Sequence, residues 1–235
     1  MKISGSVALV TGANRGLGHA FARALIERGA RTVYAGARDP ATITDPDLVP
    51  VKLDITDAAD VAATAALCGD VTLLANNAGV SYGSPLLAAP APDGARAEIE
   101  TNYFGTLAMC RAFAPVLGAN GGGALVNMLS VLSFISFPQI GSYSASKAAA
   151  WSLTNGVRLE LAAQGTLVVG VHAGFIDTDM AARIDEPKIS PIEVARQAFD
   201  AVEAGQLEVL ADGLSRDVKA ALSAELEVLY PALHG

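Results

Sequence analysis

The chain has 235 residues, of which 51% are hydrophobic and 17% charged, and its formal net charge is −8. This composition predicts a single domain over residues 1–235 with one large core. The absence of lysine- or arginine-rich runs argues against nucleic acid and anionic membrane as partners, and no stretch reaches the ~18 apolar residues of a membrane span. Cys68 and Cys110 lack metal-ligand spacing, so we expect reduced thiols, no metal site and a cytoplasmic protein.

Short apolar runs alternate with helical patterns along the whole chain. Strands are expected at residues 7–10, 32–35, 49–53, 71–75, 124–129, 167–172 and 207–211. Helices are expected at residues 17–28, 57–67, 99–117, 143–163 and 191–205, the last with Ser190 as N-cap and Pro191 in its first turn. Strands that alternate with helices of this length predict an α/β fold with a mostly parallel sheet covered on both faces.

The C-terminal tail carries a regular apolar pattern. Val218, Leu222, Leu226 and Leu229 are spaced by four, four and three residues, which predicts one helical stripe. We expect this stripe to pack on the body of the domain. A contact with a partner subunit is the alternative.

A glycine-rich turn follows the first predicted strand. Gly12, Gly16 and Gly18 form a G-x-x-x-G-x-G pattern, in which the missing Cβ atoms allow a sharp turn and a close approach to a pyrophosphate. The helix that begins near Leu17 would direct its free N–H groups and the positive end of its dipole at the phosphates. This strand–turn–helix context predicts a dinucleotide site.

The end of the second predicted strand indicates which dinucleotide binds. NAD sites place a carboxylate there for the ribose 2′-hydroxyl, whereas this chain has Arg38 and no carboxylate before Asp39. Arg38 can pair with a 2′-phosphate, and Arg15 in the glycine turn offers a second cation. We therefore expect NADP rather than NAD, with two merely solvated arginines as the alternative.

Tyr143 and Lys147 stand four residues apart on a predicted helix and so share one face. A free tyrosine, with a pKa near ~10, is a poor acid or base at neutral pH. A neighbouring ammonium would lower that pKa toward the working range. The pair alone is weak evidence, because this spacing occurs by chance on many solvated helices.

Six features in chain order together resemble the short-chain dehydrogenase/reductase family, over nearly the whole chain. They are the T-G-x-x-x-G-x-G turn of residues 11–18, Asp54 after the third strand, the N-N-A-G segment of residues 76–79, Asn102 on the long helix, Ser130 at the family's distance before Tyr143, and the Y-x-x-x-K pair of Tyr143 and Lys147. The resemblance implies a Rossmann-like, doubly wound sheet of seven strands, and assembly as a homodimer or homotetramer.

The resemblance also implies a catalytic set of four residues. Tyr143 would be the general acid or base, and Ser130 would hold the substrate oxygen. Lys147 would lower the pKa of Tyr143 and bind the nicotinamide ribose, and Asn102 would support a water chain to Lys147. The implied cofactor contacts are Gly12, Asn14, Arg15, Gly16, Leu17, Gly18, Arg38, Asp54, Ile55, Asn77, Ala78, Gly79, Tyr143, Lys147, Gly174, Ile176 and Thr178.

The chain departs from the family pattern after the sixth strand, where Ala173 replaces a common proline. The neighbouring His172 is interpreted as structural. Residues 179–189, where relatives carry a substrate lid, are too few for a long covering helix, so we expect an open cleft. Its apolar walls would be Leu132, Phe134, Phe137 and Phe175 with Tyr82 at the edge, and packing of the phenylalanines in the core is the alternative.

These expectations combine into an NADP(H)-dependent oxidoreductase. It would transfer a hydride between nicotinamide and an uncharged ketone or aldehyde, or the corresponding alcohol, as a carbonyl reductase or alcohol dehydrogenase does. An epimerase or dehydratase usually needs a longer chain. A non-catalytic protein that senses NADP(H) is the alternative from another class, but such proteins typically lose the tyrosine or the lysine.

Overall fold

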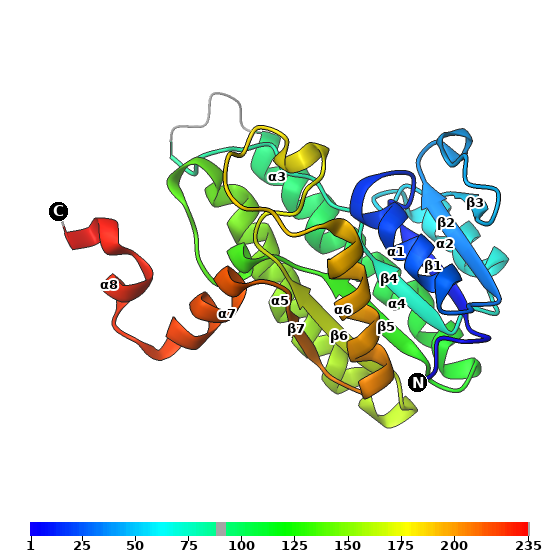
Figure 1. The fold of residues 1–235 in the computed structure, drawn as a ribbon. Helices are drawn as coiled ribbons and strands as arrows, with labels where there is room; N and C mark the ends of the chain where they lie inside the picture. Colours follow the sequence, from blue (N-terminus) through cyan, green and yellow to red (C-terminus); the bar gives the residue numbers. More distant parts are fainter. Residues whose placement is uncertain (88–92, 235) are drawn as a thin grey trace.

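A single parallel sheet organises the computed structural model, which describes residues 1–87 and 93–234 (Figure 1). Its seven strands are ordered β3-β2-β1-β4-β5-β6-β7, and every neighbouring pair is parallel. This confirms the predicted α/β, doubly wound fold. The strands are β1 (Val7–Thr11), β2 (Thr32–Ala37), β3 (Val49–Lys52), β4 (Leu73–Asn76), β5 (Ala124–Met128), β6 (Leu167–His172) and β7 (Glu208–Leu210).

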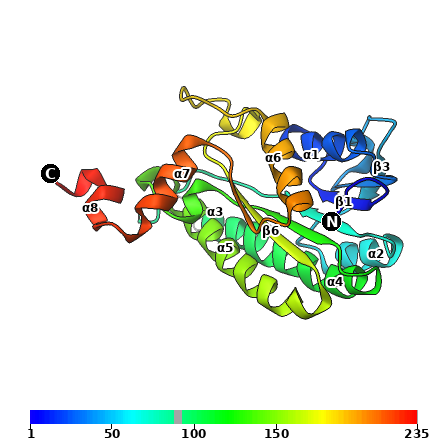
Figure 2. The same ribbon diagram turned by 60° about the horizontal axis from the view of Figure 1, so that its bottom comes forward.

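Helices cover both faces of the sheet (Figure 2). One face carries α1 (Gly16–Glu27) and α6 (Pro191–Ala204), and the other carries α2 (Ala58–Leu67), α4 (Thr106–Ala119) and α5 (Gly141–Leu161). Successive residues of β1 point to opposite faces: Ala8 and Val10 enter the core under α1 and α6, and Val7 and Leu9 enter the core under the other helices. Burial on both faces explains why the strands are continuous apolar runs.

The strand order creates a crevice at the carboxyl ends of β1 and β4. Val10 pairs with Ala75, so these two strands end side by side. From β1 the chain crosses to β2 on one side, and from β4 it continues to β5 on the other. Ligands of open α/β sheets bind outside such a switch point.

Helix α6 follows its local sequence signals closely. The Ser190 hydroxyl accepts the Glu193 N–H at 3.1 Å, Pro191 occupies the first turn, and Gly205 ends the helix in the left-handed conformation with φ of 71°. These contacts satisfy backbone groups that a helix end would otherwise leave free.

The long helix expected at residues 99–117 is present but is not one regular helix. The chain forms α3 (Asp93–Ile99), a π-helical segment (Glu100–Gly105) and then α4. Asn102 lies in the π segment and is only 1% exposed. π-helical turns are rare in proteins, and those that occur are often found at functional sites. A search for 3.6-residue periodicity does not detect them.

The expectation of one helical stripe in the tail is wrong. The chain forms α7 (Gly213–Ala220), a 3₁₀ turn and the short α8 (Leu226–Leu229), with Ala224 extended between them. Val218, Leu229 and Tyr230 pack on the cluster of Val131, Leu132 and Ile135, and the Tyr230 hydroxyl accepts the Ser136 N–H at 3.2 Å. Leu226, from the same predicted stripe, is 56% exposed. Contacts to the body of the fold thus override the helical spacing.

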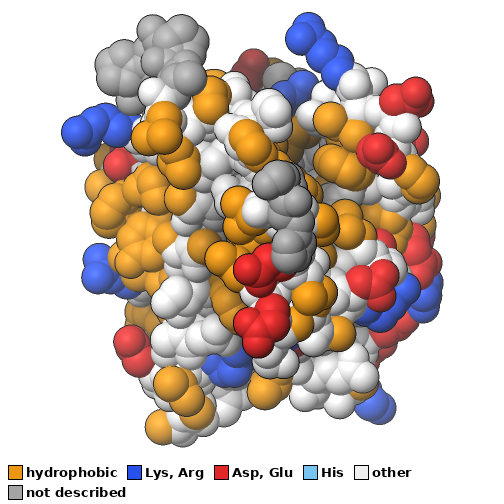
Figure 3. All heavy atoms as spheres, turned by 90° about the vertical axis from the view of Figure 1, so that its left-hand side faces the viewer, with side chains coloured by type: hydrophobic (Ala, Val, Ile, Leu, Met, Phe, Trp, Pro, Cys, Tyr) orange, Lys and Arg blue, Asp and Glu red, His pale blue; other side chains and the backbone are white. Residues whose placement is uncertain are grey.

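Apolar side chains gather on the face that is seen from the C-terminal end (Figure 3). The exposed large apolar residues of segments at this end include Tyr82, Leu86, Phe137, Leu226 and Val228. In residues 1–87 and 93–234, no helix is both long enough and apolar enough to cross a bilayer. The partner-subunit contact considered for the tail stays a prediction.

Two glycines give a matched test of this backbone. Gly205→Ala places a Cβ at a positive φ and should lower the free energy of unfolding by about 1 kcal/mol. Gly156→Ala lies within α5 with no atom near the added Cβ, and should raise it by up to ~1 kcal/mol. Denaturant unfolding of both variants measures the pair. Equal effects of the two substitutions would contradict the assigned backbone conformations.

Candidate active site

The glycine turn is shaped for close approach of a phosphate. Gly12 and Gly16 have positive φ values of 66° and 54°. A Cβ on Gly18 would lie 2.0 Å from the Gly12 carbonyl oxygen, so only glycine fits there. Arg15, which precedes α1, makes no side-chain cap, and the first N–H groups of that helix, including that of Leu17, stay available to an anion. The turn therefore fits a pyrophosphate.

A set of hydrogen bonds clamps this turn to the end of β4. The Thr11 hydroxyl accepts the N–H groups of Asn77 and Ala78 at 3.0 and 2.9 Å. The Asn77 side-chain amide donates back to the carbonyl oxygens of Thr11 and Gly12. The predicted residues of the glycine turn and of the N-N-A-G segment thus meet across the crevice.

The predicted phosphate-selecting arginines are both exposed near the crevice. Arg38 follows β2 directly. The neighbouring Asp39 is used locally, because its carboxylate accepts the Ala41 N–H at 3.0 Å. Arg15 pairs with Asp179 at 3.1 Å, a contact that is solvated on both sides. Both cations are therefore placed where an additional phosphate could recruit them.

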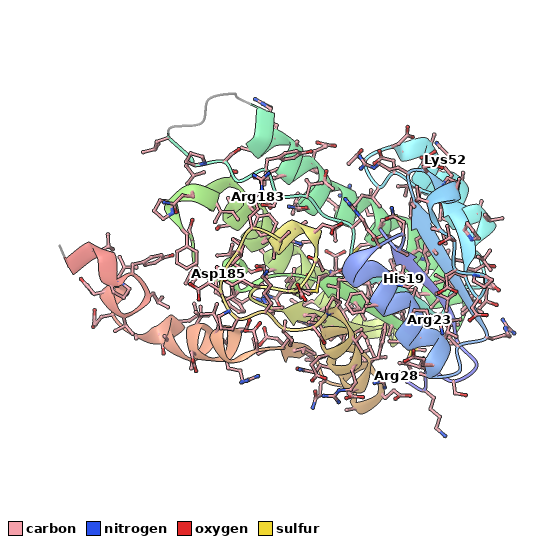
Figure 4. All side chains as sticks on the ribbon, turned by 45° about the horizontal axis from the view of Figure 1, so that its top comes forward. His19, Arg23, Arg28, Lys52, Arg183 and Asp185 are labelled. Atoms are coloured by element: carbon pink, nitrogen blue, oxygen red, sulfur yellow. The ribbon has the colours of Figure 1, made fainter. Side chains whose placement is uncertain are left out.

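A cavity beside the glycine turn adds residues that the sequence did not point to. Asn14 and Arg15 were expected there, but His19 and Asp45 were not, and the full lining is Ala13, Asn14, Arg15, His19, Ile43, Thr44 and Asp45. The Asp45 carboxylate lies 3.2 Å from Nε2 of His19 and also pairs with Arg23. Figure 4 shows His19 and Arg23 along α1. These contacts join segments far apart in sequence, so no local pattern could reveal them.

Asp54 and Ile55 follow β3 as expected for the adenine side. One carboxylate oxygen of Asp54 accepts both the N–H and the hydroxyl of Thr56, at 3.0 and 2.7 Å. Ile55 is buried, and a Cβ on Gly105 would lie 2.7 Å from its side chain. These contacts fix the loop after β3.

The catalytic residues expected from the sequence lie together at the carboxyl ends of β4 and β5. Ser130 comes just after β5, and Tyr143 and Lys147 occupy consecutive turns of α5. The Lys147 ammonium lies 5.7 Å from the centre of the Tyr143 ring and donates to the Met128 carbonyl oxygen at 2.9 Å. The Ser130 hydroxyl accepts the Leu132 N–H at 3.1 Å, which leaves its own hydrogen free to donate.

The ionisation of the pair differs from the expectation. Desolvation by the surrounding protein raises the pKa of Tyr143 to about 12, although a hydrogen bond with Ser130 opposes this shift; the charge of Glu98 adds to it. Burial also lowers the pKa of Lys147 to about 8. The expectation that Lys147 brings the pKa of Tyr143 down into the working range is therefore wrong, because burial dominates both groups.

Asn102 fixes the backbone beside these groups. Its side-chain amide donates to the Val80 carbonyl oxygen and to the Ser146 hydroxyl, both at 2.9 Å, and its oxygen accepts the Val80 N–H at 2.9 Å. In the described part of the chain, no hydrogen bond joins Asn102 to Lys147. The water chain expected at Asn102 stays a prediction. A Cβ on Gly79 would lie 3.0 Å from the Asn102 side-chain oxygen, so this glycine permits the close approach.

The loop after β6 is held at both ends. The Gly174 N–H donates to Asp212 at 2.6 Å, and Ile176 forms a parallel bridge with Ile189. Residues 179–189 contain only one short 3₁₀ turn, which agrees with the expectation that they cannot form a long covering helix. Arg183 and Asp185 lie on this exposed loop (Figure 4).

The expected apolar walls separate into two groups. Phe137 and Tyr82 are exposed, at 44% and 58%. Phe134 instead stacks on His172 with ring centres 4.2 Å apart and packs edge-on against Trp151. Phe134 and the buried Leu132 are therefore packing residues rather than free walls of the cleft, which matches the alternative weighed for Phe134, and Phe175 is half-buried.

Glu98 is a buried acid near the site that the sequence motifs did not identify. It lies one turn before Asn102 and is fully buried. One carboxylate oxygen accepts the Tyr82 N–H at 2.7 Å. The other has no hydrogen-bond partner among the described residues, yet its charge acts on Tyr143. Its only sequence signal is the four-residue spacing to Asn102.

Comparisons with known proteins agree with this arrangement. A family model described as short chain dehydrogenase matches residues 6–189. A short chain dehydrogenase from Burkholderia cenocepacia, solved with NADP, is 46% identical, has a TM-score of 0.95 and is matched over 99% of both chains. A short chain dehydrogenase/reductase from Burkholderia phymatum, solved with NAD, is 25% identical with a TM-score of 0.85 over 99% of this chain and 96% of that one. The sorbitol dehydrogenase of Cereibacter sphaeroides is 34% identical over 187 residues, which are 75% of this chain and 73% of the relative.

Burial of the Lys147 ammonium should lower the free energy of unfolding, and this effect can be measured. Lys147→Met should raise the free energy of unfolding at pH 7 by roughly 2 kcal/mol, because relief of desolvation (~3 kcal/mol) exceeds the lost hydrogen bond (~1 kcal/mol). The folded pKa of about 8 lies below the ordinary value of 10.5, so the unfolded wild type binds more protons between these pH values. The wild type therefore gains stability as pH rises from 8 to 10.5, and the advantage of the variant shrinks.

Urea unfolding of wild type and Lys147→Met at several pH values between 7 and 10.5 measures this difference. Lys2→Met, at an exposed lysine, is the matched control and should show no such trend. An advantage of Lys147→Met that stays constant with pH would contradict the lowered pKa.

Proposed function

The chain belongs to the short-chain dehydrogenase/reductase family, and from this premise we propose that it is an NADP(H)-dependent oxidoreductase of the carbonyl reductase or alcohol dehydrogenase type. The observation that carries the proposal is the convergence of Ser130, Tyr143 and Lys147 beside a glycine turn that fits a pyrophosphate. A non-catalytic sensor would not need the phenol, the ammonium and the serine hydroxyl at one end of the sheet. Turnover therefore fits the site better than sensing.

The preference for NADP rests on charge at the end of β2. Arg38 is exposed there, and the Asp39 carboxylate accepts a hydrogen bond from the Ala41 N–H. An arginine pairs well with a phosphate, whereas NAD sites usually have an acid at this place. The NADP complex of the 46% identical relative supports the preference, although a less similar relative was solved with NAD.

Three side chains divide the proton chemistry of the proposed reaction. The Ser130 hydroxyl, which makes a hydrogen bond with Tyr143, has a hydrogen that it can donate to the substrate oxygen. The raised pKa of Tyr143 keeps its phenol protonated at neutral pH, which suits proton donation to a carbonyl oxygen during reduction. Lys147 places an ammonium beside the phenol and stabilises the phenolate that donation leaves. A bound nicotinamide supplies or accepts the hydride.

The proposed substrate is an uncharged ketone or aldehyde, or the alcohol in the reverse direction. Phe137, Tyr82 and the half-buried Phe175 remain as apolar groups for the cleft, because Phe134 and Leu132 are packing residues. The buried Glu98, whose charge acts on Tyr143, would repel a carboxylate held at the reacting position. Both features favour a substrate without an acid group near its carbonyl.

The proposal includes a cytoplasmic homodimer or homotetramer with no nucleic-acid or membrane partner. Cys68 and Cys110 are free and buried, and burial raises the pKa of each thiol to about 12. Such thiols are unreactive and suit a reducing compartment. The usual assembly of the family supports the oligomer.

Tyr143→Phe tests the general acid. The variant should fold and bind NADPH, but its turnover should fall by about 10² or more, because the proton donor is lost while packing is kept. Oxidation of NADPH with a panel of ketones and aldehydes measures turnover, and NADPH fluorescence measures binding. Tyr34→Phe, whose hydroxyl contacts Asp70 away from the site, is the control. Full activity in Tyr143→Phe would show that the acid is misassigned.

Arg38→Ala tests the cofactor preference. The wild type should use NADPH better than NADH in kcat/KM, and the variant should lose most of this advantage, roughly tenfold or more, while its use of NADH changes little. Arg31→Ala, an exposed arginine at the opposite end of β2, is the matched control and should leave the ratio unchanged. A wild type that is indifferent to the 2′-phosphate would overturn the preference.

A further inference from the structure

His172 links the end of β6 to the catalytic serine. Its side chain is fully buried, and Nδ1 lies 3.0 Å from the Ser130 carbonyl oxygen. A carbonyl oxygen can only accept a hydrogen bond, so Nδ1 carries the proton. The same residue whose hydroxyl is assigned to the substrate oxygen is therefore held through its main chain by an imidazole.

An ion pair from the C-terminal segment stands behind the imidazole. Nε2 of His172 lies 3.6 Å from a carboxylate oxygen of Glu208 on β7, too far for a hydrogen bond. The same oxygen accepts a hydrogen bond from the Lys219 ammonium of α7 at 2.9 Å. Nε2 itself has no hydrogen-bond partner in the described residues. Lys219 thus compensates the charge that faces the unprotonated ring nitrogen.

Aromatic contacts fix the plane of the imidazole. Phe134 stacks on it at 4.2 Å, and Trp151 packs edge-on at 6.2 Å. The Lys219 ammonium lies 4.8 and 4.9 Å from the centres of these two aromatic rings. One lysine therefore contacts the aromatic cage by cation–π attraction and the carboxylate by a charged hydrogen bond.

We propose that His172 is a positioning residue that holds Ser130 through its Nδ1–H, and that Lys219 neutralises the Glu208 carboxylate that faces the unprotonated Nε2. Because Ser130 is the donor to the substrate oxygen, this role rests on the proposed function. A shift of the Ser130 main chain would move its hydroxyl relative to Tyr143, and small misplacements cost rate. The C-terminal segment thereby supports the reacting groups without touching them.

The surroundings of His172 decide whether its pKa is raised or lowered. Burial lowers the pKa of His172 to about 4; Lys219 and Lys147 also lower it, whereas the Ser130 carbonyl and Glu208 raise it. Burial therefore keeps the ring neutral at pH 7, and Lys219 opposes the effect of Glu208. Without Lys219, the uncompensated carboxylate of Glu208 would raise the pKa of His172, so that Nε2 takes a proton at a higher pH than in the wild type.

Nitrogen NMR of the imidazoles tests the arrangement without any turnover. The chain has three histidines, and loss of one signal set in His172→Phe identifies the residue. In the ¹⁵N-labelled full-length wild type, His172 should be neutral and protonated on Nδ1 from pH 6 to pH 8. A ring protonated on Nε2, or on both nitrogens, in this range would overturn the proposal even if the protein turned over no substrate.

Two substitutions at His172 separate positioning from packing. His172→Phe keeps a ring against Phe134 but removes the donor, and kcat should fall roughly tenfold with little change in KM for NADPH. His172→Asn loses the aromatic contact but places an N–H near the position of Nδ1, and it should recover most of the lost kcat. Better activity in the phenylalanine variant than in the asparagine variant would overturn the role.

A double-mutant comparison at Lys219 and Glu208 tests the ion pair while His172 itself is unchanged. In Lys219→Met the pKa of His172 should rise from about 4. The kcat should fall only at acidic pH, where Nε2 takes a proton and Glu208 attracts the charged ring away from the Ser130 carbonyl, while kcat at pH 7 should change little. Adding Glu208→Gln to that variant removes the uncompensated charge and should restore both the pKa and kcat. A loss in Lys219→Met that the second substitution does not reverse would show that Lys219 acts only by packing on Phe134 and Trp151, and would refute its assigned role.

Discussion

The clamp between the glycine turn and the end of β4 is the constraint on which the site depends. The Thr11 hydroxyl holds two consecutive N–H groups of the N-N-A-G segment, and Asn77 returns its amide to the turn. Because β1 and β4 are neighbours in parallel register, these bonds join the two sides of the crevice. Gly18 lets the turn close with no Cβ in the way. The phosphate end and the reacting end therefore share one rigid frame.

A second set of buried polar contacts fixes the helix that carries the reacting groups. The Asn76 amide donates to Asn127 at 2.9 Å, and Asn127 donates to the Thr154 hydroxyl at 2.9 Å. These bonds run from β4 through β5 to α5. Apolar packing alone would allow α5 to rotate or slide at small cost, whereas a buried chain of directed bonds selects one position. The placement of Tyr143 and Lys147 beside Ser130 follows from that selection.

Local sequence signals predicted the parts of the molecule that local physics determines. The apolar runs gave the strands, Ser190 and Gly205 marked the ends of α6, and the motif residues met at the switch crevice. The π segment at Asn102 was not predictable from periodicity, and the tail follows contacts to residues almost a hundred positions away. Ionisation was mispredicted for the same reason, because the desolvation of Tyr143 depends on the assembled fold and not on its neighbour four residues away.

The distribution of unsatisfied polar atoms separates the two halves of the site. On the phosphate side, the Thr11 hydroxyl accepts two backbone N–H groups and the Asn77 amide donates to two backbone carbonyls. On the reacting side, Lys147 is a desolvated ammonium held by the Met128 carbonyl, and one oxygen of Glu98 and Nε2 of His172 have no partner in the described chain. Buried polar groups of this kind are costly, and a large aliphatic core offsets the cost. The glycine turn and the end of β4 are therefore already held in place where the cofactor would bind. On the reacting side, buried charged and polar groups lie where a proton would move, so their protonation depends strongly on nearby charges.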